Sequence, residues 1–221
     1  LLSRSVVSCG AVELRIRSEY QLTKKSSLQQ DMVFYSKDRK IGFETVMNWQ
    51  DDHRFLKAAF DTSVQSRFAR NEVQFGYIER ATYRNTSWEK AKFEASNHKY
   101  TDLSEPGYGV AVLNDCKYGV SVENGRIWLS LHKGGCRPDY RGDKGIHECT
   151  YALLPHNSGF GAEAVVQPAY ELNIAPIVMP GKKELESFVT VDAPNVIVEA
   201  VKPMEDGNGY ALRLYEAEGT S

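Results

Sequence analysis

Short runs of alternating apolar and polar residues recur along this chain, and they constrain its fold more than any other feature. In residues 41–49, for example, Ile41, Phe43, Met47 and Trp49 fall on alternate positions. This alternation is typical of strands that bury one face. The same reasoning predicts strands in the runs 73–77, 127–131, 149–153, 188–191, 196–201 and 210–215.

Turn sequences separate many of these runs, as in Pro106-Gly107, Asn124-Gly125 and Gly134-Gly135. Many strands at short spacing favour a sandwich over βαβ units. We therefore predict a mainly β fold, with one large antiparallel β-sandwich in residues 1–165. Because Gly, Pro and Asn cluster around 159–180, residues 166–221 are expected to form a linker and a smaller C-terminal β subdomain, or a part that packs on the same sandwich. Short helices are expected only at 87–93 and 162–172, the second interrupted by Pro168.

The charge balance excludes some partners. The chain has 221 residues, with 27 basic and 29 acidic side chains and a net charge of −2, so neither nucleic acid nor a membrane surface is expected to bind it. Its longest apolar stretch, 172–181, is too short to span a bilayer. The four cysteines form no CxxC pair, which favours reduced thiols in a cytoplasmic protein. The start at Leu1, without Met or a signal peptide, is interpreted as a position inside a longer protein.

Polar and aromatic residues gather in three loop segments, 80–88, 102–110 and 113–119. Sugar sites combine such residues, because Asp, Asn, Glu and Arg bond hydroxyl groups while Trp or Tyr faces the ring. The alternative is that these segments are ordinary turns with local ion pairs, and composition alone favours that alternative. Asp102, Glu105 and Asp115 are the crowded carboxylates from which a glycosidase pair could be drawn.

The five histidines form no HxxxH or HExxH motif and no His-x-Asp pair, so the sequence predicts no metal site in this chain. No nucleotide-binding or GxSxG motif is present either.

The loop segments and their flanks resemble the C-terminal region of glycoside hydrolase family 38 α-mannosidases, closest to the cytosolic and bacterial branch. The resemblance is collinear over nearly the whole chain and is strongest in 84–88, 102–105, 107–110 and 113–119, with further stretches at 56–60, 151–156, 169–173, 191–196 and 213–216. It implies a sandwich of the mutarotase-like supersandwich type, followed by smaller β domains.

The resemblance also implies a retaining, zinc-dependent exo-α-mannosidase that hydrolyses terminal α-mannosides. Its Asp nucleophile and zinc ligands belong to an N-terminal α/β domain and a following helical bundle, onto which no residue here can be matched. We therefore expect no catalytic residue and no cofactor in this chain, with zinc in the missing catalytic domain. The expected partners are the enzyme's own N-terminal catalytic and helical domains and mannose-containing glycans, and a homo-oligomer is left open.

By their position in the resembling motifs, six residues are expected at the rim of the sugar pocket: first Asp115, Asn114 and Tyr118, then Arg84, Asn85 and Glu105. The same loops could instead form the interdomain interface. Two rival functions remain. One is a stand-alone carbohydrate-binding sandwich with Trp88 or Trp128 as its platform. The other is a mutarotase-like enzyme that uses His98 or His147 with a carboxylate.

Overall fold

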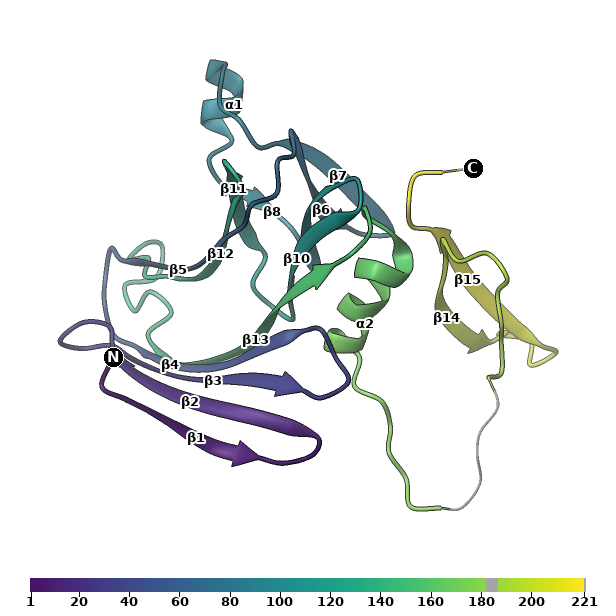
Figure 1. The fold of residues 1–221 in the computed structure, drawn as a ribbon, viewed down its shortest axis with the longest axis horizontal. Coiled ribbons are helices and arrows are strands. Elements are labelled where there is room, and N and C mark those ends of the chain that lie inside the picture. The colour runs from purple at the N-terminus through teal and green to yellow at the C-terminus, as the bar shows by residue number, and fades with distance from the viewer. Residues whose placement is uncertain (182–186, 221) are drawn as a thin grey trace.

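The computed structural model describes residues 1–181 and 187–220, and its strands form two large layers (Figure 1). All their pairings are antiparallel, as predicted. The large sheet has nine strands in the order β1 (Ser3–Cys9), β2 (Glu13–Gln21), β3 (Ser27–Tyr35), β4 (Ile41–Trp49), β13 (Gly145–His156), β10 (Tyr108–Asn114), β9 (Tyr100–Glu105), β6 (Phe68–Val73) and β7 (Gly76–Ala81). The small sheet has four strands in the order β5 (Phe55–Asp61), β12 (Arg126–Lys133), β11 (Gly119–Glu123) and β8 (Ala95–Ser96).

The main core lies between these sheets, which confirms the predicted antiparallel sandwich. Phe43 and Tyr151 of the large sheet stack with ring centroids 5.1 Å apart, and Phe60 of β5 packs across at 5.6 Å from Phe43. Apolar residues from β9, β10 and β12 fill the centre, because their alternation puts one parity of each strand inward. Fully buried members include Met47, Val64, Leu103, Val112, Ile127 and Leu129.

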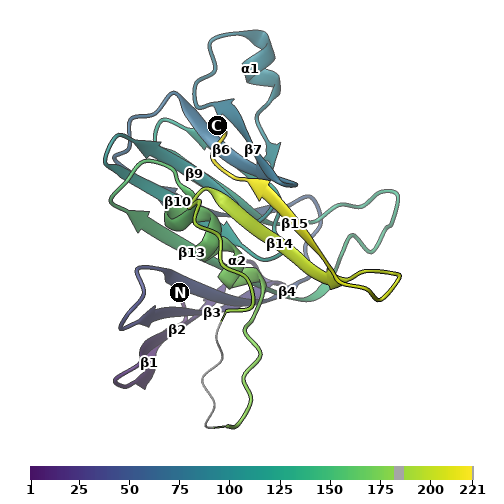
Figure 2. The ribbon, with the colours of Figure 1, turned by 90° about the vertical axis from the view of Figure 1, so that its right-hand side faces the viewer.

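A second core covers the other face of the large sheet. A π-helical turn, η1 (Ala162–Val166), leads directly into α2 (Gln167–Asn173), so the helix predicted at 162–172 is confirmed. Pro168 lies in the first turn of α2, directly after the π-helical turn, and does not end the helical segment. The hairpin of β14 (Val196–Pro203) and β15 (Tyr210–Glu216) packs beside these helices, as Figure 2 shows face-on. The core's members include Tyr100, Ala111, Leu113, Leu154, Val165, Ile197 and Ala217.

Two strand predictions were wrong in position. Residues 73–77 are not one strand, because β6 ends at Val73, β7 begins at Gly76, and Phe75 between them has a positive φ of 60°. The alternation there continued across a tight turn. Residues 188–191 have no strand pairing, because β14 begins only at Val196 and pairs with β15 alone among the described strands. The helix expected at 87–93 exists as α1 (Ser87–Ala91).

Strands β1 to β3 extend the large sheet beyond the small one, and we call them the wing (Figure 1). The outer face of the wing is charged. Arg17 Nε lies 2.7 Å from Asp31 Oδ1, and Arg15 Nη1 lies 2.5 Å from Glu44 Oε2. The hydrogen bonds from Arg17 hold the pKa of Asp31 below its ordinary value, so Asp31 stays charged beside the two arginines.

All four cysteines are free: Cys9 and Cys116 are exposed, Cys136 is half-buried and Cys149 is buried. Among the described residues, no helix has the length and apolar character that a membrane span requires.

Candidate functional site

The most prominent surface feature is α1, which projects from one end of the sandwich without a buried residue of its own (Figure 1). Its start is fixed by a capping box. Thr86 Oγ1 accepts from the Glu89 N–H at 3.2 Å, while Glu89 Oε2 accepts from the N–H groups of Asn85 and Thr86 at 2.7 and 2.8 Å. The hydrogen bond from the Thr86 N–H, joined by that from Asn85, holds the pKa of the Glu89 carboxyl below its ordinary value. Trp88 on this helix is 79% exposed, which makes α1 a candidate contact surface.

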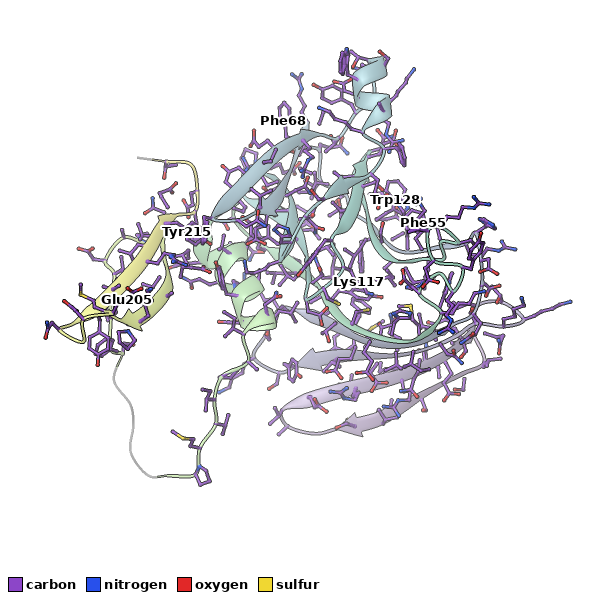
Figure 3. All side chains as sticks on the ribbon, turned by 180° about the vertical axis from the view of Figure 1, so that it is seen from behind. Phe55, Phe68, Lys117, Trp128, Glu205 and Tyr215 are labelled. Carbon is purple, nitrogen blue, oxygen red and sulfur yellow. The ribbon has the colours of Figure 1, made fainter. Side chains whose placement is uncertain are left out.

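A cavity of about 430 Å³ lies at the base of α1, between the β6–β7 hairpin and β11. Arg84 reaches Glu123 Oε2 at 3.5 Å, and Arg80 donates to the Ser96 carbonyl at 2.8 Å. Burial lowers the pKa of Arg80. Figure 3 labels Phe68, which lines the cavity at the end of the sheet nearest α1. Guanidinium, carboxylate and aromatic groups thus converge on one hollow, a combination that can bind hydroxyl-rich ligands or a polypeptide loop.

Three of the six predicted site residues lie at this end of the sandwich. Arg84 lines the cavity, and Asn85 immediately precedes the N-cap of α1. Glu105 accepts from the Gln65 N–H at 2.9 Å. The neighbouring Ser66 carbonyl accepts from Thr82 at the end of β7, so Glu105 lies close to the start of the loop that carries Arg84.

The other three lie at the opposite end of β10. Asn114 is fully buried; its amide donates to the His98 carbonyl at 2.6 Å and its oxygen accepts from the Lys117 N–H at 2.8 Å. Asp115 Oδ2 accepts from the Thr150 N–H at 2.9 Å. Its Oδ1 is buried and has no partner among the described residues. Tyr118 is half-exposed and meets the His98 ring edge-on at 5.0 Å.

The structure therefore separates the six residues into two groups. Glu105 pairs with Tyr108 at the start of β10, and Asn114 ends that strand. Six residues at about 3.4 Å each put the two groups roughly 20 Å apart. One small sugar cannot touch both groups, so only one of them can line a single monosaccharide pocket.

Sequence reasoning missed one buried polar cluster. His156 Nε2 lies 2.9 Å from Asp102 Oδ1, although 54 residues separate them in the chain. Ser104 donates to Asp102 Oδ2 at 2.7 Å, and the Ser158 carbonyl lies 2.8 Å from His156 Nδ1. A side chain at Gly109 would overlap the His156 ring and lie 2.7 Å from Ser104 Cβ. His156 is buried and Asp102 is completely buried. We therefore interpret the cluster as a structural one that holds neighbouring strands of the sheet together.

The two histidines of the mutarotase-like alternative lie apart from this cluster. His98 meets Tyr118, and His147 Nε2 lies 2.5 Å from the Asp143 carbonyl. Neither ring bonds a carboxylate among the described contacts. Within residues 1–181 and 187–220, no group of three or more His, Cys, Asp or Glu side chains could hold a metal ion.

These features define a class, an antiparallel β-sandwich domain with a helical flank and an exposed loop cluster at one end. The description "Glycosyl hydrolases family 38 C-terminal domain" belongs to the family model that matches residues 3–141. Alpha-mannosidase 2C1 of Homo sapiens is 41% identical over 90% of this chain, and Alpha-mannosidase G of Dictyostelium discoideum is 38% identical over 87%. The chain therefore belongs to glycosyl hydrolase family 38, in its C-terminal domain, and the predicted family is confirmed.

A solved structure supports the fold. The alpha-mannosidase from Enterococcus faecalis V583 superimposes with a TM-score of 0.81 over 97% of this chain at 14% identity, and the match covers 29% of that protein. The chain spans about a fifth of the curated relatives it matches, 20% of the human protein and 18% of the Dictyostelium protein.

Proposed function

We propose that this chain is the non-catalytic C-terminal part of a retaining, zinc-dependent exo-α-mannosidase that hydrolyses terminal α-mannosides. Membership of family 38 supports the proposal. So do the relatives from Homo sapiens, Dictyostelium discoideum and Saccharomyces cerevisiae, all of which are named alpha-mannosidase. The side chains of the described residues also support a zinc site elsewhere in the longer protein, because they offer no set of ligands that fits zinc. No catalytic step is therefore assigned to residues of this chain.

The role proposed for the chain is to brace the sugar pocket and the domain interfaces of the full-length enzyme. The exposed α1 end carries this proposal. Trp88 is 79% exposed and Phe93 is 63% exposed, and the helix is held by a capping box instead of by packing. Exposing these large apolar side chains to water costs free energy, and contact with another domain would remove that cost. Arg84 and Asn85 at its base are the residues proposed to face the pocket or that domain.

The first test compares the 221-residue chain with the full-length protein. We expect the full-length protein to cleave an aryl α-mannoside and to retain zinc after purification, and we expect the isolated chain to do neither. Release of the aryl group and the metal content of the purified proteins are the measurements. Turnover or stoichiometric zinc in the isolated chain would overturn the proposal, and so would a full-length protein that lacks both. Mannoside binding by an inactive chain would point instead to the carbohydrate-binding alternative.

A second test concerns Arg84 in the full-length enzyme. Arg84→Ala is expected to lower kcat/KM at least about tenfold, because a charge-assisted hydrogen bond to sugar or to the catalytic domain contributes about 1.5–3 kcal/mol. The matched control is Glu123→Ala, which removes the partner that lies 3.5 Å from Arg84. An exposed ion pair contributes at most about 1 kcal/mol, so the control is expected to stay within a few-fold of wild type. Equal losses of kcat/KM in the two variants would show that Arg84 acts only through its ion pair with Glu123.

A further inference from the structure

A row of apolar side chains crosses five strands of the large sheet. The small sheet covers one end of this row, in β13 and β4, but not the other end, in β2 and β1. The strand register pairs Val6 with Ile16, Ile16 with Met32, Met32 with Phe43, and Phe43 with Tyr151. Tyr151 and Phe43 are buried, Met32 and Ile16 are half-buried, and Val6 is 60% exposed. The packing surface of the core thus continues into the wing, where no described strand lies over it.

The neighbouring row has the same character. Leu14 pairs with Phe34, Phe34 with Ile41, and Ile41 with Leu153. All four are half-buried. The Arg15, Arg17, Asp31 and Glu44 ion pairs lie on the outer face of the wing. The two apolar rows lie on its other face, beside a polar row of Arg4, Ser18 and Gln30. Two adjacent apolar rows that continue from a buried core are suited to packing against another layer.

The small sheet stops where that layer is needed. Its last strand, β5, pairs with β12 on one side and with no described strand on the other. Leu56, Ala58 and Phe60 of β5 pack on the main core but remain half-buried. Phe60 lies over Phe43 and Tyr151, so β5 ends the small sheet above β4 and β13. An added strand would lie about 4.8 Å further on, in the same layer, over the wing.

We propose that β-strands of the full-length enzyme from outside these 221 residues pair with the free edge of β5 and cover Val6, Ile16 and Met32. This inference rests on the proposed function, since it needs the longer protein of which the relatives are examples, five-fold longer than the match. The occupant is a strand with alternating apolar residues, because it must satisfy both an unpaired backbone edge and an apolar row. A second copy of the wing packed face to face would cover the row and leave the β5 edge unpaired.

Cysteine accessibility in the full-length enzyme tests this interface. Val6→Cys and Ile16→Cys are each compared with Ser5→Cys, which lies next to Val6 on the same strand and faces the charged side. The variants are made in a Cys9→Ser background, because Cys9 lies only three or four residues from positions 5 and 6. A maleimide probe is used, and mass spectrometry of the peptide that holds the new cysteine gives its rate. We expect both buried-row variants to react at least about tenfold more slowly than Ser5→Cys, at every enzyme concentration.

Equal rates would overturn the proposal, and protection that appears only as the enzyme dimerises would assign the surface to a second copy. Hydrogen exchange of the unsubstituted enzyme covers the case in which a variant fails to fold. Residues 55–61 are expected to exchange slowly, as an interior strand does, and exchange as fast as that of an exposed edge would also overturn it. An enzyme that cleaves mannoside but labels fast refutes only this inference. An inactive enzyme that labels slowly refutes only the proposed function.

Discussion

Replacing Asp102 with alanine is expected to lower the free energy of unfolding of the 221-residue chain by roughly 3 kcal/mol. Asp102 is completely buried, and its two oxygens meet His156 Nε2 at 2.9 Å and the Ser104 hydroxyl at 2.7 Å. Alanine would leave His156 Nε2 and the Ser104 O–H without a hydrogen-bond partner in the interior. The Ser104 oxygen also accepts from Arg70 at 3.3 Å, so Asp102 orients a hydroxyl that bonds a third side chain.

Denaturant unfolding measures the effect, with two controls beside it. Asp102→Asn keeps the shape and one acceptor, so it is expected to lose less than Asp102→Ala. Asp61→Ala is the matched surface change, because the Asp61 side chain is 70% exposed and pairs only with Arg126 among the described ion pairs. That variant is expected to stay within about 1 kcal/mol of wild type. Comparable losses at positions 61 and 102 would show that the buried cluster contributes nothing special.

Acidification is expected to destabilise the chain through His132 well before the carboxylates titrate. Burial, followed by the nearby His147 and Lys117, lowers the pKa of His132 from 6.5 to about 4. Its ring lies 4.3 Å from the His147 ring and 4.9 Å from Trp49. In the unfolded chain the imidazole takes a proton as the pH falls through 6.5, whereas in the folded chain it stays neutral down to about 4.

The unfolded state therefore binds more protons in that window, and the free energy of unfolding falls as the pH falls. The part of this shift that lies between pH 6.5 and pH 4.5 corresponds to roughly 2–3 kcal/mol. Urea midpoints between pH 7.5 and pH 4.5 measure the loss, and His132→Leu removes the titrating group. The free energy of unfolding of His132→Leu minus that of wild type is expected to decrease as the pH rises. A difference that does not vary with pH would exclude His132 as the cause.

Local pattern was sufficient for most of the fold. The alternation in 41–49 and 127–131 and the Asn124-Gly125 turn between β11 and β12 follow directly from strand geometry and from residues that accept positive φ. The pattern failed at Phe75, because alternation is blind to a two-residue turn that happens to preserve parity. It failed at 188–191 because β propensity does not provide a partner strand.

The candidate site was less predictable than the fold. The resemblance singled out Arg84 and Asn114 together, yet the length of β10 separates them. Asp102 stood out as a crowded carboxylate, but its partner His156 is reached only through the register of β9, β10 and β13. Register is a property of the assembled sheet, so no spacing rule along the chain could reveal this pair.

The position of β13 bears on how this domain should be delimited for expression and for comparison across genomes. The family match ends at residue 141, whereas β13 begins at Gly145 and lies in the middle of the large sheet, between β4 and β10. A polypeptide trimmed to the matched segment would lack β13. Its large sheet would then be divided into two parts, each with an unpaired strand edge. The segment that the family match covers is thus shorter than the domain that forms the complete sheet, and cloning boundaries should follow the domain.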